Sequence, residues 1–130
     1  MVRFTRNTLL IGSILMALAV ILGAFGAHAL TDRLTEHQVE SYRTGVLYQF
    51  LHSIAILFLG LLSYHVSEQK LRWPVVLLGL GILFFSGSIY LLATADLTGI
   101  PKSILGPITP IGGVLFIAGW ISLAYQLSKK

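Results

Sequence analysis

The chain has 130 residues, of which 55% are hydrophobic and 11% are charged, and its mean hydropathy is +0.84. A water-soluble domain carries roughly 25% charged residues, so this composition excludes an ordinary soluble protein. Cysteine is absent, which excludes disulfides and thiolate metal sites but says nothing about the redox compartment. The net charge of +4 indicates membrane topology, not nucleic-acid binding. We predict an all-α fold, an integral membrane four-helix bundle that forms a single domain over residues 1–130.

Four apolar segments follow one another along the chain, at residues 8–27, 46–64, 75–95 and 108–125. Each approaches the roughly 20 residues that a helix needs to cross a bilayer core of about 30 Å. The first segment also resembles a secretory signal, because a basic start and an apolar stretch precede Ala27-His28-Ala29. This stretch is longer than the roughly 7 to 15 residues of a signal core, so we expect it to remain as the first span.

The polar segment between the first two spans reads as a helix start. Thr35 and Gln38 have the spacing of a capping box, and Leu34 and Val39 that of a hydrophobic staple. A second helix over residues 36–64 would be roughly 43 Å long at 1.5 Å per residue, so its first turns would project from the bilayer core. That extension is either solvated or a partner-binding face, and we favour the solvated one.

The third and fourth spans have distinct starts. Trp73-Pro74 is expected to mark the third, with Trp at the interface and Pro in the first helical turn. The fourth opens with a run of helix-breaking residues, namely Gly106, Pro107, Pro110, Gly112 and Gly113. Pro110 cannot donate a backbone hydrogen bond, which predicts free carbonyls nearby. The run is either a capping turn or a ligand-facing break at membrane depth.

Small residues predict where helices meet. Ala19, Gly23 and Ala27 form a row on the first helix that would allow close approach of another helix in lipid. Weaker rows involve the glycines of the later spans, Gly79, Gly87, Gly112 and Gly119. We assign these rows to packing within one bundle in preference to oligomerisation.

Polar side chains within the spans define the candidate site, because such groups are costly in hydrocarbon and are by default a functional hypothesis. Counted at 1.5 Å per residue, they fall at similar depth in the half of the bilayer where the first span ends. The candidate ligand-binding residues are His28, Tyr48, Gln49, His52, Ser88, Tyr90 and Thr109. A structural His52 would be neutral and bonded to Tyr90 or to a carbonyl near the prolines. The alternative is a proton, ligand or metal role.

Enzyme chemistry finds little support. The chain has no nucleophile elbow, zinc-protease helix motif or phosphate-binding glycine loop in the expected context, and no carboxylate lies deep beside the histidines. Three-ligand metal catalysis is therefore disfavoured, and so is a haem between His28 and His52, whose depths differ. We predict no catalytic residue, no metal and no cofactor.

Several motifs carry a family resemblance. In chain order they are Gly23-Ala24-Phe25-Gly26-Ala27-His28-Ala29-Leu30, Tyr48-Gln49-x-x-His52, Phe85-Ser86-Gly87-Ser88-Ile89-Tyr90 and Gly106-Pro107-Ile108-Thr109-Pro110-Ile111-Gly112-Gly113, followed by Gly119-Trp120. The chain resembles the domain of unknown function 423 family, also called UPF0382, and its relative, transmembrane protein 256. The resemblance implies a small four-span protein of bacterial inner membranes and brings no activity with it. Ser53 stands where the family often has Ala.

Two classes of function remain. The favoured one is a structural or assembly partner in the membrane, with the polar cluster holding the bundle together. The alternative is binding or transport of a small molecule, a lipid or a proton through that cluster. The expected partners are membrane lipid and a membrane protein or a second copy of the chain, with no nucleic acid.

Basic residues predict the topology, because those close to a span are retained in the cytoplasm. A chain that starts inside the cell would place six of the nine there, namely Arg3, Arg6, Lys70, Arg72, Lys129 and Lys130, against Arg33, Arg43 and Lys102 outside. Reporter fusions in the cell membrane should therefore find both termini and the Lys70 loop in the cytoplasm. Cytoplasmic labelling of a cysteine introduced at Glu36 would overturn this assignment.

Overall fold

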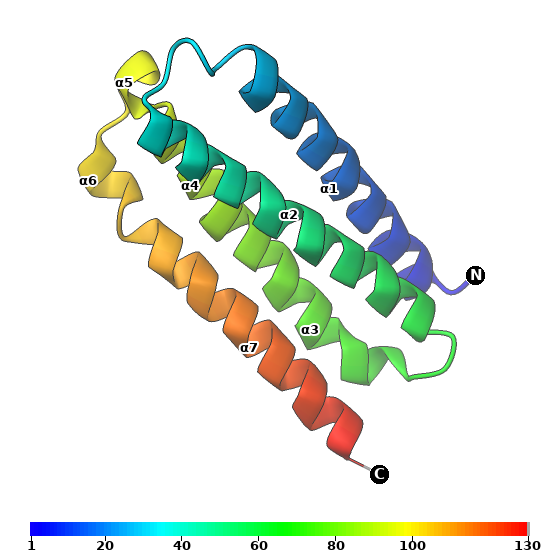
Figure 1. The fold of residues 1–130 in the computed structure, drawn as a ribbon. Coiled ribbons are helices and arrows are strands. Elements are labelled where there is room, and N and C mark those ends of the chain that lie inside the picture. The colour runs from blue at the N-terminus through cyan, green and yellow to red at the C-terminus, as the bar shows by residue number, and fades with distance from the viewer. Residues whose placement is uncertain (130) are drawn as a thin grey trace.

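The computed structural model describes residues 1–129, so Lys130, one of the six basic residues assigned to the cytoplasm, lies outside it. Residues 1–129 contain helices and no strand (Figure 1). The elements are α1 (Arg3–His28), α2 (Glu36–Leu62), α3 (Glu68–Gly81), the π-helical turn η1 (Ile82–Ser86), α4 (Gly87–Ala93), α5 (Ala95–Thr98), α6 (Lys102–Leu105) and α7 (Ile108–Ser128).

Four helical stretches are long and apolar enough to cross a membrane, which confirms an all-α fold with four candidate spans. They cover Arg3–His28, Glu36–Leu62, Glu68–Ala93 and Lys102–Ser128. The stretches alternate in direction, so both ends of the chain lie at one end of the molecule and the short helices α5 and α6 at the other (Figure 1). We call these the terminal end and the loop end.

The start of α2 is the one that its capping residues predict. The Thr35 hydroxyl accepts a hydrogen bond from the Gln38 backbone N–H at 3.3 Å, and the Gln38 side-chain oxygen accepts from the Thr35 N–H at 2.9 Å. Leu34 and Val39 belong to the same apolar cluster at the loop end. The predicted capping box is confirmed, although α2 ends at Leu62, two residues before the predicted end.

The predicted start of the third span is wrong. The helix begins at Glu68, so Pro74 lies inside it and not in its first turn. The Pro74 ring is fully buried against the neighbouring helices. A proline within a membrane helix is tolerated where neighbouring groups and local adjustment compensate for the lost backbone bond. Trp73-Pro74 therefore signals a packed position and not a helix end.

Helix α1 packs mainly on α2, and α7 packs mainly on α3 and η1. Helices α1 and α7 therefore flank a central pair formed by α2 and the α3–η1–α4 stretch (Figure 1). The buried small residues of α1 recur every seven residues, at Thr5, Gly12, Ala19 and Gly26. This spacing keeps one seam of a helix against its neighbour. The predicted row is thus only partly right: Ala19 is buried, whereas Ala27 is exposed.

The closest approach between backbones involves α7 and the π-turn. A Cβ added to Gly112 would lie 2.6 Å from the Phe85 Cα and closer still to the Phe85 nitrogen. Gly119 and Gly81 make similar room for Leu78 and Phe116 across the α3–α7 interface. Of the weaker glycine rows, Gly112 and Gly119 thus mediate packing inside the bundle, while Gly79 and Gly87 have open space beside them.

Two apolar clusters form the core. The larger lies toward the terminal end and unites Ile56 and Leu59 of α2 with α3 and α7, and the smaller lies at the loop end around Leu30 and Tyr42. The buried polar side chains of α2 occupy the stretch between them, at Gln49, His52 and Ser53.

Gly112→Ala tests the backbone contact. The added methyl group would overpack a rigid neighbour, which costs about 1–3 kcal/mol, so we expect that loss of unfolding free energy in detergent micelles. Gly87→Ala is the control, because its Cβ meets nothing within 4 Å and alanine is favoured over glycine in a helix by about 1 kcal/mol. Equal stability of the two variants would show that α7 does not lie against the π-turn.

Candidate functional site

The Gln49 side chain is the centre of the buried polar residues. It is 3% exposed, and its amide nitrogen donates to the Leu15 carbonyl of α1 at 2.9 Å. Its oxygen accepts from the Tyr90 hydroxyl of α4 at 2.6 Å. One side chain of α2 therefore satisfies groups on two other helices, because an amide offers donor and acceptor together.

Two further contacts join the helices around Gln49. The Ser86 hydroxyl, in the π-turn, donates to the Gly45 carbonyl of α2 at 2.7 Å. The hydroxyls of Ser88 in α4 and Thr109 in α7 lie 2.6 Å apart. Each of the helices α1, α4 and α7, together with the π-turn, thus takes part in a buried or partly buried hydrogen bond with a neighbour.

His52 is held separately, on the side of α2 that faces α7. Its Nε2 accepts a hydrogen bond of 3.2 Å from the Trp120 indole, which can only donate. Its Nδ1 lies 2.8 Å from the Tyr48 carbonyl, which can only accept, so Nδ1 must carry the proton. The geometry selects the neutral Nδ1–H tautomer and uses both ring nitrogens.

Aromatic rings surround this histidine. The His52 ring stacks on Phe116 with centroids 3.6 Å apart, and Tyr48 packs against Phe85 at 4.6 Å. Phe116 and Phe85 also meet edge to face at 5.5 Å. His52 is only 6% exposed as a result, which leaves the imidazole fixed in position.

The predicted site residues therefore fall into three sets. Gln49 joins Tyr90, Ser88 joins Thr109, and His52 lies beside Tyr48. His28 is exposed at the end of α1. The expected bond from His52 to Tyr90 or to a proline-region carbonyl is wrong, because Trp120 supplies a donor to His52 and Gln49 takes the Tyr90 hydroxyl.

Sequence reasoning missed the roles of Trp120, Ser86 and Tyr42. Tyr42 donates to the Leu22 carbonyl of α1 at 2.7 Å. The available signal was the chemistry of these side chains, since a Trp or Tyr inside a span needs a partner for its polar atom. Ser53 remains an exception: it is fully buried, and its hydroxyl has no hydrogen-bond partner within residues 1–129.

The helix-breaking run forms a capping turn. Gly106 donates to the Lys102 carbonyl and closes α6, Pro107 caps α7, and Pro110 is the third residue of α7, where its missing N–H costs nothing. Gly112 and Gly113 lie within α7. Gly106, Thr109 and Pro110 also line an open groove of about 560 Å³ between α2, α4 and α7.

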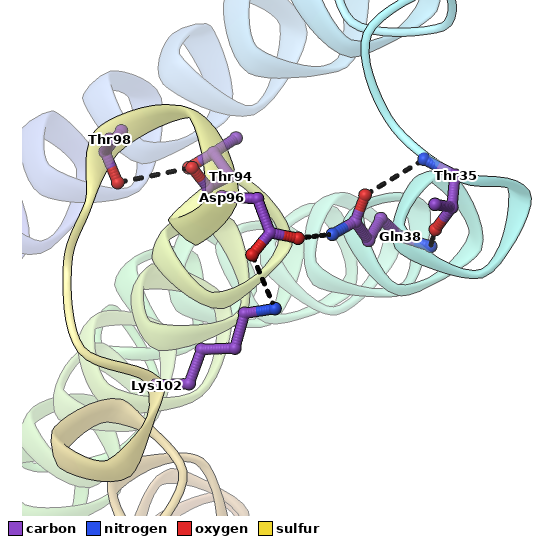
Figure 2. Close-up of polar contacts among 6 residues, drawn as sticks. All are labelled: Thr35, Gln38, Thr94, Asp96, Thr98 and Lys102. Atoms are coloured by element: carbon purple, nitrogen blue, oxygen red, sulfur yellow. Dashed lines mark hydrogen bonds and ion pairs between the residues drawn. The ribbon is translucent and has the colours of Figure 1, made fainter.

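Polar contacts tie this loop end together (Figure 2). The Gln38 amide nitrogen donates to Asp96 at 2.7 Å while its oxygen caps α2, and Lys102 pairs with Asp96 at 2.8 Å. Lys102 and then Gln38 lower the pKa of the Asp96 carboxyl below its ordinary value. The stability that this lowered pKa contributes is present above about pH 4 and is lost as the pH falls further, and the exposure of the Asp96 side chain keeps it small.

No group of three or more His, Cys, Asp or Glu side chains in residues 1–129 is arranged to hold a metal ion. We call the buried polar side chains Gln49, His52, Ser53, Ser86 and Ser88 the polar layer. The fold and the site together define a small multi-pass α-helical membrane protein with this polar layer between its helices.

The comparisons with known proteins identify the family. The family described as protein of unknown function (DUF423) matches residues 22–113, and the chain belongs to it. A UPF0382 membrane protein of Staphylococcus epidermidis is 43% identical over 93% of this chain and 94% of its own length. The UPF0382 inner membrane protein YgdD of Escherichia coli K12 is 37% identical over 97% and 95%. No solved structure matches the chain significantly.

Gln49→Leu should cost about twice as much unfolding free energy as Tyr90→Phe. Hydrogen bonds between membrane helices are worth about 0.6 kcal/mol on average, and the first variant loses two of them while the second loses one. Unfolding of both variants in mixed micelles would measure this ratio. Equal losses would show that the contact with the Leu15 carbonyl does not bind α1.

Proposed function

We propose that this protein is a structural or assembly partner in the cell membrane (the inner membrane or plasma membrane). Both of its termini would lie in the cytoplasm. The observation that carries the proposal is that its buried polar side chains are largely bonded to other groups of the same bundle. Gln49, Ser86 and Ser88 each have a partner on another helix, and so does His52. They stabilise the helix arrangement and offer few free atoms to a ligand.

The charge distribution supports the orientation, since five of the nine basic residues lie at the terminal end and Lys130 is outside the described residues. An assembly role also accounts for the absence of a catalytic constellation among these polar groups, and we propose that the protein is not an enzyme.

The outer faces of α1 and α7 are where a partner would bind. Only 17% of the apolar window of α1 and 22% of that of α7 is buried, against 44% for α2. Large apolar side chains such as Ile14 on α1 and Ile117 on α7 are about 60% exposed. A partner helix would replace lipid on such a face through close packing.

In-cell photo-crosslinking tests this role. A photoreactive residue at Ile14 or Ile117 should yield at least one protein adduct of discrete size, whereas the buried Ile56 should yield none. An adduct of twice the chain mass would identify a second copy as the partner. Lipid adducts alone at both exposed positions would contradict the proposal.

Proton or ligand binding at His52 is the competing function, favoured by the Trp120 indole, which is 47% exposed beside the histidine. His52→Gln separates the two functions because it keeps a polar side chain but does not titrate. The assembly role predicts unchanged crosslinking with His52→Gln. Loss of the adduct in a variant that unfolds like the native protein would favour the titratable role.

A further inference from the structure

A charged groove lies at the terminal end, apart from the polar layer. Helices α1 and α3 both begin at this end and make few contacts with each other, which leaves an open groove of about 530 Å³ between them. Its polar lining consists of Arg3, Asn7 and Thr8 from α1, with Glu68 and Arg72 from α3.

The charges of this groove are not used inside the protein. Within residues 1–129, Arg3, Arg72 and Glu68 form no ion pair, although all three line the same groove. Two guanidinium groups and one carboxylate give the groove a net charge of +1. The N-termini of α1 and α3 add positive potential at the same end.

Thr8 adds a hydroxyl to the polar lining of the groove. Its residue is only 2% exposed, and it lines the groove. Thr5, one turn earlier and equally buried, bonds the Ser63 hydroxyl at 2.7 Å and is not part of this lining. The Thr8 hydroxyl can donate to an oxygen of a group that enters the groove.

The lining changes from charged to apolar along the helices. Ile11 and Val76 each lie eight residues beyond the first residue of their helix, or about 12 Å at helical rise. A ligand that fills the groove must combine an anionic head with an apolar tail. This is the chemistry of a membrane phospholipid, and basic pockets between membrane helices bind such headgroups.

We propose that the groove binds one anionic phospholipid with a glycerol headgroup. Arg3 and Arg72 hold its phosphate, Thr8 donates to a lipid oxygen, and the Glu68 carboxylate accepts from a headgroup hydroxyl. One acyl chain lies along Ile11 and Val76. Neither Ile14 nor Ile117 lines the groove, so the lipid assignment is tested separately from the assembly role.

Native mass spectrometry of the detergent-purified protein, titrated with phosphatidylglycerol, tests the proposal. Each neutralised arginine should weaken binding about 5-fold, so Arg3→Gln with Arg72→Gln should weaken it about 25-fold. The matched control is Arg33→Gln with Arg43→Gln, which removes two positive charges at the loop end and should change binding less than 2-fold. Equal loss in the two double variants, or no loss in either, would overturn the site.

Glu68→Gln tests the headgroup contact and should change lipid affinity in the opposite direction from the arginine variants. The amide still accepts from a hydroxyl but no longer repels phosphate, so phosphatidylglycerol should bind 2-fold to 5-fold more tightly. A misfolded variant would not bind more tightly. Preferred binding of phosphatidylethanolamine that Glu68→Gln abolishes would show that the carboxylate holds an ammonium group. Displacement of the lipid by an equal concentration of inorganic phosphate would refute the role of the acyl chain.

Discussion

The cost of an unpaired polar group in hydrocarbon is the constraint on which this structure depends. Inside a bilayer a side-chain amide or hydroxyl has no water to bond, so it must find a partner in the protein. Gln49 meets this requirement by bonding α1 and α4 at once, and it can do so only if both helices are correctly placed. The polar layer therefore specifies which helices are neighbours. Apolar side chains do not specify this by burial alone, because lipid tails are as apolar as a neighbouring helix.

The hydrogen bonds of the polar layer also require close packing of the helix backbones. The hydrogen bonds of Ser86 and Ser88 need α4 and the π-turn to approach α2 and α7 within side-chain reach. Gly112 allows that approach, because a Cβ there would overlap the backbone at Phe85. A π-turn at this contact is consistent with the frequent occurrence of such turns at functional positions. Here it joins the helix pair of α3 and α7 to the polar layer.

Local chemistry made much of the fold predictable. The four spans follow from apolar length, and the start of α2 follows from Thr35 and Gln38, whose contacts are within one helical turn. Trp73-Pro74 led to a wrong helix start. The missing N–H of Pro74 is a local property that suggests a first helical turn. Whether α3 tolerates a proline in its interior depends on the neighbouring helices, which sequence spacing does not reveal. The same holds for the site. Depth along each span predicted one group of polar residues, whereas the structure divides them into three sets and leaves His28 exposed. Rotation about each helix axis decides that Trp120, and not Tyr90, bonds His52.

The two ends of the molecule differ in how their charges are used. At the loop end Gln38 and Lys102 both bind Asp96, so the charges connect α2 to the loop between α4 and α7 (Figure 2). At the terminal end, within the part of the chain that the structure describes, Arg3 and Arg72 form no ion pair, although Glu68 lines the same groove. Paired charges restrain a loop, whereas unpaired cations beside apolar walls at a membrane surface attract anionic lipid. The polar layer lies between these two regions, so the hydrogen bonds that order the helices are separate from the charged end that we propose to bind lipid.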